Sequence, residues 1–344
     1  MNICFLMYPW EKIDPETDST LRLIHEAVCR NHKVGIIYPN NLTIRKSLTY
    51  GFVKVIVKKD KIHSGSVAFY KGVTFKEQLL PMSGFDVIFM RDNPPIDNIA
   101  LNFLDSVRDD TFLINDIDGL RKANNKLYPA AFYDPDNEII PVTHVSKNKE
   151  YLKKIVQQSR TNKMILKPLN GYGGSGVIVI EKNAMQNVNS LLDFYIDGKE
   201  GSNYVILQEY VEGAEEGDVR VLMLNGEPIG AMKRIPANDD IRSNVHAGGS
   251  VIKHTLTREE KLICKKIAPK LVADGLYLVG LDIISGKLIE VNVCSPGGIS
   301  RINKLNRVKL QKKVIDFAES VVREKEASIQ RKSEFRKTIE NAEG

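Results

Sequence analysis

A glycine-rich loop between two apolar segments constrains the fold of this chain more than any other feature. Residues 171–176 read Gly-Tyr-Gly-Gly-Ser-Gly, which contains the spacing G-x-G-x-x-G. In a dinucleotide-binding βαβ unit, this spacing opens a helix whose N-terminus holds the pyrophosphate. Here the next residues, Val177–Ile180, are all β-branched and are typical of a strand. The sequence therefore predicts a strand–loop–strand unit and argues against a nicotinamide-dependent dehydrogenase.

The same loop is suited to holding phosphate groups. Glycine has no side chain, so backbone N–H groups can approach phosphate oxygens closely. Lys167, at the end of the preceding strand Met164–Pro168, would add a cation beside them. A Walker P-loop is not expected, because the Gly-Lys-Ser/Thr ending is absent from the sequence. The alternative is a hairpin that binds no ligand, although four glycines in six residues cost backbone entropy on folding.

A second hairpin, residues 279–292, carries acidic and amide side chains where two strands would face each other. A three-residue turn at Ser285–Lys287 would place Asp282 directly opposite Glu290. Asn292 lies two residues beyond Glu290 and therefore on the same face of the strand. Such oxygen ligands are typical of Mg²⁺ bound together with a phosphate substrate. The sequence therefore predicts a magnesium site on this hairpin.

That prediction depends on the register of the two strands. A two-residue loop would oppose Asp282 to Ile289 instead and would separate the two carboxylates. In the predicted register, the neighbouring apolar side chains face a core; these are Leu281, Ile283, Ile289 and Val291. The alternative to a metal site is a solvated acidic face balanced by nearby lysine or arginine.

Strand and helix patterns alternate over the first 120 residues, which predicts an α/β layer structure. Apolar periodicity predicts a helix over Ser19–Cys29. The expected strands are Ile3–Met7, Val34–Tyr38, Phe85–Met90 and Phe112–Asn115, with Phe52–Val57 and Ser66–Tyr70 as antiparallel additions.

These first 120 residues (1–120) are expected to form an N-terminal domain, and three further segments follow it. We expect a small lid with the glycine loop over residues 121–212, a strand-rich segment over 213–322, and a charged tail over 323–344. Thr257 and Glu260 have the form of a capping box that starts a helix. Its apolar face would consist of Leu262, Ile263, Ile267 and Leu271. The last helix is expected to begin near Arg301 and to run into the tail.

Charge and cysteine content exclude several classes of protein. The 344 residues carry a net charge of +6, and residues 301–344 hold most of it, with twelve Lys or Arg against seven Asp or Glu. The remaining body is nearly neutral, so no nucleic-acid surface is expected. Four cysteines without C-x-x-C spacing indicate a reducing cytoplasm rather than a disulfide scaffold. No run of about 18 apolar residues occurs, so no membrane-spanning helix is expected.

Basic residues cluster after the strand that begins at Asp218. Arg220, Arg234 and Arg242 lie within about 25 residues of one another, beside the expected phosphate site. Any one of them is more often a surface charge, but three together favour anion recognition. The polar loop over residues 237–249 is a candidate lid over a charged substrate.

These motifs together resemble the bacterial glutathione synthetase branch of the ATP-grasp ligases, from the first strand to about Val322. Seven ordered segments carry the resemblance: residues 90–95 (MRDNPP), 167–174 (KPLNGYGG), 217–222 (GDVRVL), 242–244 (RSN), 247–249 (AGG), 279–282 (VGLD) and 290–296 (EVNVCSP).

The resemblance implies an α/β (α+β) ATP-grasp fold with a Rossmann-like N-terminal domain, a lid and a C-terminal antiparallel-sheet domain. ATP would lie between two antiparallel sheets. The implied enzyme is an ATP-dependent carboxylate–amine ligase that joins glycine to γ-glutamylcysteine through an acyl phosphate. The implied cofactors are ATP and Mg²⁺, with Mn²⁺ as an alternative metal, and a homo-oligomer in the cytoplasm is expected.

The resemblance also implies roles for individual residues. The residues matching the phosphoryl-transfer positions are Asp218, Arg220 and Arg242. Those matching ATP-binding positions are Lys126, Lys167, Gly173, Gly174, Gln208, Glu209, Tyr210 and Val211. The substrate positions are matched by Asp18, Ser19, Arg91, Arg234, Asn244, Gly248, Gly249 and Ser295. The Mg²⁺ ligands are matched by Asp282, Glu290 and Asn292.

One departure concerns the acceptor side of the site. After Ser295-Pro296 the family often has threonine and another small residue, whereas this chain has Gly297-Gly298. A related ligase that uses another amine, for example glutamate, is therefore an alternative. A non-catalytic ATP-binding regulator is a further alternative, against which the complete set of phosphoryl-transfer residues argues.

Overall fold

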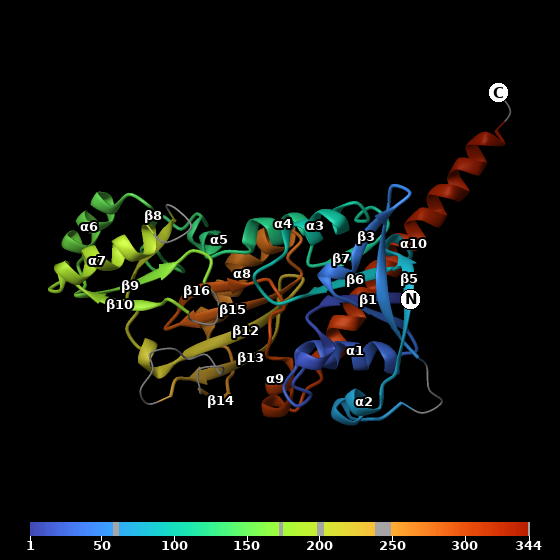
Figure 1. Cartoon of the computed structure of the whole chain (residues 1–344), viewed down its shortest axis with the longest axis horizontal. Helices are drawn as coiled ribbons and strands as arrows, with labels where there is room; N and C mark the ends of the chain where they lie inside the picture. The colour runs from blue at the N-terminus through green and yellow to red at the C-terminus, as the bar shows by residue number, and fades with distance from the viewer. Residues whose placement is uncertain (58–61, 172–174, 198–202, 238–248, 343–344) are drawn as a thin grey trace. The chain divides into compact units, whose positions relative to one another are not determined.

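The chain folds into two compact units, whose helices and strands are labelled in Figure 1. This computed structural model describes residues 1–57, 62–171, 175–197, 203–237 and 249–342. One unit consists of Met1–Ile117 together with Val308–Gly344, and the other consists of Asp118–Arg307. Mixed helix and strand content in both units agrees with the predicted class. The predicted boundaries at residues 120, 212 and 322 stay predictions.

The first unit is built on a mixed sheet with the strand order β3-β4-β2-β1-β6-β7, in which β5 pairs with the far side of β4. The central pairs β1–β2, β1–β6 and β6–β7 are parallel, whereas β4 pairs antiparallel with β2, β3 and β5. The strands are β1 (Asn2–Met7), β2 (Lys33–Ile37), β3 (Leu42–Arg45), β4 (Leu48–Ile56), β5 (Phe75–Pro81), β6 (Val87–Arg91) and β7 (Phe112–Ile114). The helices are α1 (Ser19–Cys29), α2 (Ser66–Gly72), α3 (Asn98–Asp105) and α10 (Leu310–Glu340).

The core of this unit is centred on the paired strands β1 and β6. Apart from Asn2 and Arg91 at their ends, both strands are apolar and buried on both faces, as parallel strands are. The Phe5 and Phe89 rings stack across the pair with centroids 4.9 Å apart. The predicted α/β layer is therefore confirmed. The prediction of a strand at Ser66–Tyr70 is wrong, because these residues form α2.

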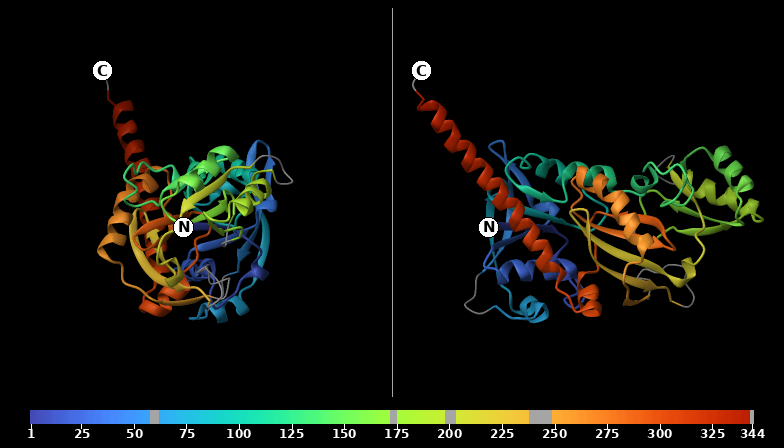
Figure 2. Two further views of the ribbon diagram at one scale, coloured as in Figure 1. Left: turned by 90° about the vertical axis from the view of Figure 1, so that its left-hand side faces the viewer. Right: turned by 180° about the vertical axis from the view of Figure 1, so that it is seen from behind.

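The predicted single helix from Arg301 into the tail is also wrong, because two helices occupy this stretch. The first, α9 (Ile299–Asn306), ends at Arg307, which adopts a left-handed conformation with φ of 54°. A residue in this conformation ends a helix by turning the chain out of it. α10 then runs without a break from Leu310 across residue 323 (Figure 2). Its buried residues lie in its first half.

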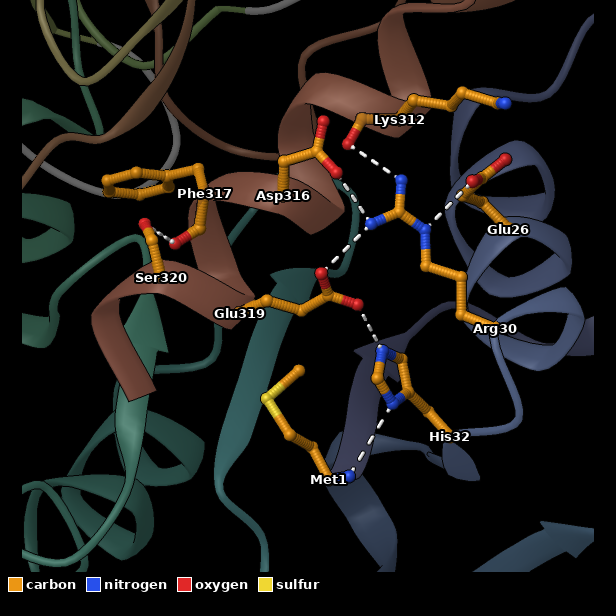
Figure 3. A network of polar contacts seen from close by, with 9 residues as sticks. All are labelled: Met1, Glu26, Arg30, His32, Lys312, Asp316, Phe317, Glu319 and Ser320. Carbon is orange, nitrogen blue, oxygen red and sulfur yellow. Dashed lines mark hydrogen bonds and ion pairs between the residues drawn. The ribbon is translucent and has the colours of Figure 1, made fainter. Parts of the chain in front are cut away.

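Arg30 ties α10 to the N-terminal part of its own unit, as Figure 3 shows. Its guanidinium forms ion pairs with Glu26 at 2.9 Å, Asp316 at 2.6 Å and Glu319 at 3.0 Å. His32 Nε2 lies 2.8 Å from the second oxygen of Glu319, which extends the network to the residue before β2. Three carboxylates around one guanidinium form a network, which contributes more than an isolated surface pair.

Replacing Arg30 with methionine should therefore loosen α10. We expect a loss of about 1 kcal/mol in the free energy of unfolding, because the network is partly exposed to solvent. We also expect faster proteolysis of the C-terminal helix in the native protein. Urea denaturation and limited trypsin digestion would measure the two effects. Arg331→Met, on the exposed half of α10, is the control and should behave like the wild type; equal behaviour of the two variants would contradict the anchoring role.

The second unit contains two antiparallel sheets. The smaller has the strand order β10-β9-β11-β8, and α6 and α7 cover one of its faces. Its core residues alternate along the strands, for example Met164 and Leu166 on β9 and Val205 and Leu207 on β11. The elements are β8 (Thr143–Ser146), α6 (Lys149–Gln158), β9 (Lys163–Pro168), β10 (Ile178–Glu181), α7 (Met185–Ile196) and β11 (Val205–Glu209). The predicted strand–loop–strand unit around the glycine loop is confirmed by the antiparallel β9–β10 pair.

The larger sheet has the order β14-β13-β12-β15-β16. Its strands are β12 (Asp218–Leu224), β13 (Glu227–Ile235), β14 (Ser250–Lys253), β15 (Leu278–Ile284) and β16 (Lys287–Asn292). The helices α4 (Ile117–Ala123), α5 (Leu127–Ala130) and α8 (Arg258–Ala273) also belong to this part of the chain. α8 begins with the predicted capping box of Thr257 and Glu260, but Leu262 is exposed rather than on the apolar face.

Among the described residues, no helix combines the length and the apolar content that a membrane span requires.

Candidate active site

The β15–β16 hairpin places Asp282 directly opposite Glu290, as predicted, although the turn that joins the strands differs from the predicted one. The turn has two residues rather than three, because Ile284 pairs with Lys287. Ser285 and Gly286 have φ of 44° and 73°, as a tight type I′ turn requires. A β-bulge then inserts Ile289 as an extra residue on β16 and restores the Asp282–Glu290 pair.

The bulge changes the face to which Ile289 belongs. Leu288 and Val291 are buried, whereas Ile289 and Glu290 are both half-buried. Ile289 also lines a small cavity together with Lys126 and Lys167. The prediction that Ile289 faces the core is therefore wrong, and the structure adds Ile289 to the candidate site.

Buried charges alternate across neighbouring strands of the larger sheet. Arg220 on β12 pairs in register with Asp282 on β15, and Asp218 pairs with Arg234 on β13. Arg220 Nη2 lies 3.0 Å from Asp282 Oδ2, and Nε binds the other oxygen of the same carboxylate. Arg234 Nε lies 2.6 Å from Asp218, and its Nη2 also lies 3.0 Å from Asp282. All four side chains are at most 8% exposed, so each charge depends on its partners.

These ion pairs determine the protonation state of Asp282. Burial alone would raise the pKa of Asp282, but the Arg220 and Arg234 guanidinium groups hold it well below its usual range. Burial likewise disfavours the charged form of Arg234, and the carboxylates of Asp282 and Asp218 raise its pKa above the ordinary value. Asp282 and Arg234 are therefore both charged at neutral pH.

Gly280 makes room for this cluster. A Cβ atom there would lie 3.3 Å from Arg220 Nη1 and 3.3 Å from Pro296 Cβ. Gly280 is two residues from Asp282, so it lies on the same face of β15. The missing side chain leaves room beside β15 for the Arg220 guanidinium.

Lys126 connects the glycine loop to the hairpin. Its Nζ lies 2.8 Å from Glu290 Oε1 and also donates to the carbonyl oxygen of Gly171. Its backbone N–H donates to Leu169 O at 3.1 Å, which fixes the lysine beside the loop. A predicted phosphate-binding lysine and a predicted metal ligand are thus in direct contact.

Lys167 lies on the face of the smaller sheet that turns away from the α6–α7 core. Its ammonium donates to Gln208 Oε1 at 2.9 Å and lines the same small cavity as Lys126, Ile206 and Ile289. Burial, together with repulsion from Lys126, lowers the pKa of Lys167 to about 8 in spite of the attraction of Glu290. The cavity therefore holds a cation whose charge is unfavourable until an anion joins it.

A second set of polar residues lies at the carboxyl ends of β1 and β6 in the first unit. The chain leaves β1 toward β2 on one side and returns at β6 on the other, so this point is a topological switch, where α/β sheets bind ligands. Asp18 caps α1 and accepts from Tyr8 Oη, and Arg91 Nε donates to Thr20 Oγ1 at 3.0 Å. The structure thus brings the predicted residues Asp18, Ser19 and Arg91 to one edge.

Sequence reasoning missed Tyr8 and Thr20 at this edge, since a single tyrosine or threonine carries no spacing signal. Arg91 is only 2% exposed, and burial lowers its pKa, partly offset by the nearby Tyr8 and Asp18. Burial, together with the negative charge of Asp18, raises the pKa of Tyr8.

The remaining predicted residues fall into two groups. Arg242, Asn244, Gly248, Gly173 and Gly174 lie outside the described residues. Gly249 directly precedes β14, Ser295 forms a turn with φ of 45° after β16, and Gln208 to Val211 continue from the end of β11 into the following loop.

The donor set of the hairpin fits Mg²⁺ at Glu290 and Asn292. The two residues share one face of β16, and Glu290 contacts the cavity lysine Lys126. Carboxylate and amide oxygens are ligands that suit a hard cation. Asp282 already binds two guanidinium groups, and Asn292 Nδ2 lies 3.1 Å from it. The assignment of Asp282 as a third metal ligand stays a prediction. Within the described part of the chain, no group of three or more His, Cys, Asp or Glu side chains converges as a metal site.

Comparison with known protein families covers almost the whole chain. Residues 1–121 match the N-terminal domain of prokaryotic glutathione synthetase, and residues 125–307 match the ATP-grasp domain of the same family. The glutathione synthetase of Gloeobacter violaceus is 35% identical over 328 residues, which cover 92% of this chain and 96% of that protein. The glutathione synthetase of Thermosynechococcus vestitus is 35% identical over 92% of this chain and 98% of that protein.

Comparison with solved structures supports the fold. The D-cycloserine synthetase DcsG superposes with a TM-score of 0.64 over 94% of this chain and 99% of that chain, at 15% identity. The ATP-grasp ligase PsnB in complex with a minimal precursor, Mg and ADP superposes with a TM-score of 0.60 over 93% and 98%, at 12% identity. The predicted ATP-grasp fold is therefore confirmed.

Proposed function

Because the chain belongs to the prokaryotic glutathione synthetase family, we propose that it joins glycine to γ-glutamylcysteine with ATP and releases ADP and phosphate. The observation that carries this proposal is the charged cluster of the second unit. It combines the buried arginines, Glu290 and Asn292 of the larger sheet with the cavity lysines Lys126 and Lys167. That set supplies what the transfer of a phosphoryl group to a carboxylate requires.

The reaction we propose has two steps. The cysteine carboxylate of the dipeptide attacks the γ-phosphorus of ATP, forms an acyl phosphate and releases ADP. The amine of glycine then attacks the acyl carbon, the amide bond forms, and inorganic phosphate leaves with the proton of the amine passing to solvent. Both steps pass through states with concentrated negative charge, so the protein contributes mainly fixed positive charge and exclusion of water.

The residues of the second unit would divide this work. Lys126 and Lys167 would bind the ATP phosphates, and Arg220 would stabilise the negative charge that develops on the transferred group. Asp218 and Asp282 hold Arg234 and Arg220 in place through the paired contacts. When bound, Mg²⁺ would supply charge neutralisation for the phosphates. Lys126 would exchange its contact with Glu290 for a phosphate, so that Glu290 could serve the metal.

The first unit would receive the dipeptide at the switch between β1 and β6, where Arg91 supplies a positive charge beside Asp18 and Ser19. We propose that these residues recognise the charged groups of γ-glutamylcysteine. The localisation and the oligomeric state predicted from the sequence stay predictions.

A ligase with another amine substrate is the second candidate. Gly298 has φ of 124°, which excludes most other residues, whereas Gly297 has no such constraint, and a Cβ atom added there would meet no other atom within 4 Å. The carbonyl oxygen of Gly297 lies 3.5 Å from Arg220 Nη1. The exposed Gly297 could therefore be replaced by a larger residue, so its presence beside Arg220 motivates testing other amines.

Phosphate release distinguishes the two candidates. Purified protein with ATP, Mg²⁺ and γ-glutamylcysteine should release phosphate when glycine is added, and glutathione should appear by mass spectrometry. Glutamate, alanine, serine and β-alanine serve as the amine panel. Release only with another amine would support the second candidate, and ATP binding without release for any amine would leave a regulator as the explanation.

Nucleotide binding should take up a proton near pH 8. Lys167 in the free protein loses its proton as the pH rises through about 8, and nearby phosphates would raise that pKa. Binding at pH 8 is therefore expected to take up as much as about half a proton. Isothermal titration with a non-hydrolysable ATP analogue in buffers of different ionisation enthalpy measures this uptake. Lys167→Met should abolish it; the same uptake in the variant would assign the proton to another group.

A further inference from the structure

The Lys167 ammonium is held by a chain of hydrogen bonds that crosses three neighbouring strands. Lys167 Nζ donates to Gln208 Oε1 at 2.9 Å, and Gln208 Nε2 donates to Thr143 Oγ1 at 2.8 Å. The Thr143 hydroxyl in turn donates to the backbone oxygen of Pro141 at 2.7 Å. The chain therefore ends on a backbone atom that cannot rotate away.

Chemistry fixes the direction of every bond in this chain. An ammonium group only donates, so the Gln208 atom that faces it is the amide oxygen. The amide nitrogen must then point toward Thr143, and the threonine oxygen can accept because its own hydrogen is used on Pro141. Each side chain is thus left with one orientation.

The strand register makes the arrangement rigid. Thr143 on β8 lies directly opposite Gln208 on β11, and Lys167 on β9 lies opposite Ile206, one diagonal step from Gln208. All of them share the face that turns away from the α6–α7 core, and all line the small cavity beside β16.

We propose that Thr143 is a positioning residue that, through Gln208, aims the Lys167 ammonium into the small cavity beside β16. This inference rests on the proposed function, because it assumes that the anion in the cavity is a nucleotide phosphate. Gln208 is neutral, so it orients the ammonium without cancelling its charge. A carboxylate at the same place would bind the ammonium as well but would leave less net charge for the phosphate.

Other charged groups also face Lys167, so the variants used in the test must leave those groups unchanged. Glu290 on β16 attracts its ammonium and Lys126 at the start of α5 repels it. The variants below leave both of these side chains unchanged.

Thr143→Val keeps the shape of the side chain and removes the hydroxyl group. We expect the dissociation constant of Mg²⁺ with adenylyl imidodiphosphate, measured by isothermal titration at pH 7.5, to rise about 3- to 10-fold, which is the effect of one net hydrogen bond. Thr143→Ser keeps the hydroxyl and should bind within about twofold of the wild type. Thr161→Val is the matched control, because Thr161 is also half-buried and also donates to a backbone oxygen, that of Lys163, at 2.9 Å. It should bind like the wild type.

The pH dependence separates positioning from a general loss of structure. Without the oriented Gln208 oxygen, the charged form of Lys167 is less favoured, so its pKa should fall. The pH above which nucleotide affinity declines should therefore move downward in Thr143→Val and remain unchanged in Thr161→Val. Thermal unfolding midpoints should be similar for the two valine variants.

A double-mutant cycle tests whether Thr143 acts through Gln208. In a Gln208→Leu background, Thr143→Val should cost almost nothing further, because the chain is already broken. Full additivity of the two losses, or wild-type affinity and pH dependence in Thr143→Val, would overturn the inference. If the wild-type protein binds the analogue but releases no phosphate from ATP with any amine, only the proposed function is overturned. If it does not bind the analogue, both the proposed function and the role of Thr143 are overturned.

Discussion

Glu290→Gln is expected to lower turnover about 100-fold or more while the protein remains folded. Glu290 provides a carboxylate on the cavity face of the larger sheet, and its pairing with Lys126 shows that this carboxylate can hold a cation there. Glutamine keeps the shape and one oxygen atom but removes the negative charge that a divalent metal requires. Removal of one electrostatic contact in such a site costs about 10²- to 10³-fold in rate.

The loss should appear in the rate at saturating ATP and in the concentration of Mg²⁺ needed for half-maximal activity. The stability should change little, because the Glu290 side chain is 30% exposed and its ion pair with Lys126 contributes under about 1 kcal/mol. Phosphate release at several Mg²⁺ concentrations, combined with urea denaturation, measures both quantities. Glu138→Gln is the control, since Glu138 also pairs with a lysine in the same unit but lies away from the cavity. Wild-type turnover in Glu290→Gln would remove Glu290 from the metal site.

The hairpin shows what a sequence can and cannot predict about such a site. The spacing of Asp282, Glu290 and Asn292 correctly indicated that the three side chains share one face. It did not indicate the two-residue turn with a compensating bulge, because an inserted residue and a longer loop have the same length in the sequence. Because of this ambiguity, Ile289 was predicted to face a core, whereas it lines the cavity.

Short apolar segments are the second source of error. Ser66–Tyr70 has β-branched and aromatic residues in strand-like proportion, yet it forms α2, with Phe69 buried and Arg22 bound to Ser66. A segment of this length has no clear period, so its tertiary contacts decide the conformation. The capping box at Thr257 was predicted correctly because its signal is local and depends on two side chains.

Contacts that depend on three or more strands could not be predicted at all. The Thr143–Gln208–Lys167 chain joins residues that are 65 and 41 positions apart in the sequence. Only the order β9-β11-β8 in the smaller sheet brings them together. The role of Gly280 beside Arg220 was also missed, because it follows from the pairing of β12 with β15, which the sequence does not indicate.

Asp282→Asn is expected to destabilise the second unit by about 3–5 kcal/mol, the cost of leaving buried charges without their partner. Asp282 is 4% exposed and binds both Arg220 and Arg234, while Asp218 is the other carboxylate in the cluster. Asparagine would leave two guanidinium groups facing one carboxylate. Turnover should fall as well, because Arg220 would lose the contact that orients it.

The pH dependence of this loss identifies its cause. The arginines hold the pKa of Asp282 below its unfolded value of about 3.9, so its contribution to stability is fully present above that pH. The contribution is lost as the pH falls through the lowered pKa of the folded state. The difference between wild type and Asp282→Asn in urea denaturation should therefore be constant from pH 5 to 8 and should shrink below about pH 4. Asp193→Asn, which breaks an exposed pair with Lys149, should show no measurable change at any pH. A difference for Asp282→Asn that persists undiminished at pH 3 would mean that altered packing, rather than the lost charge, destabilises the variant.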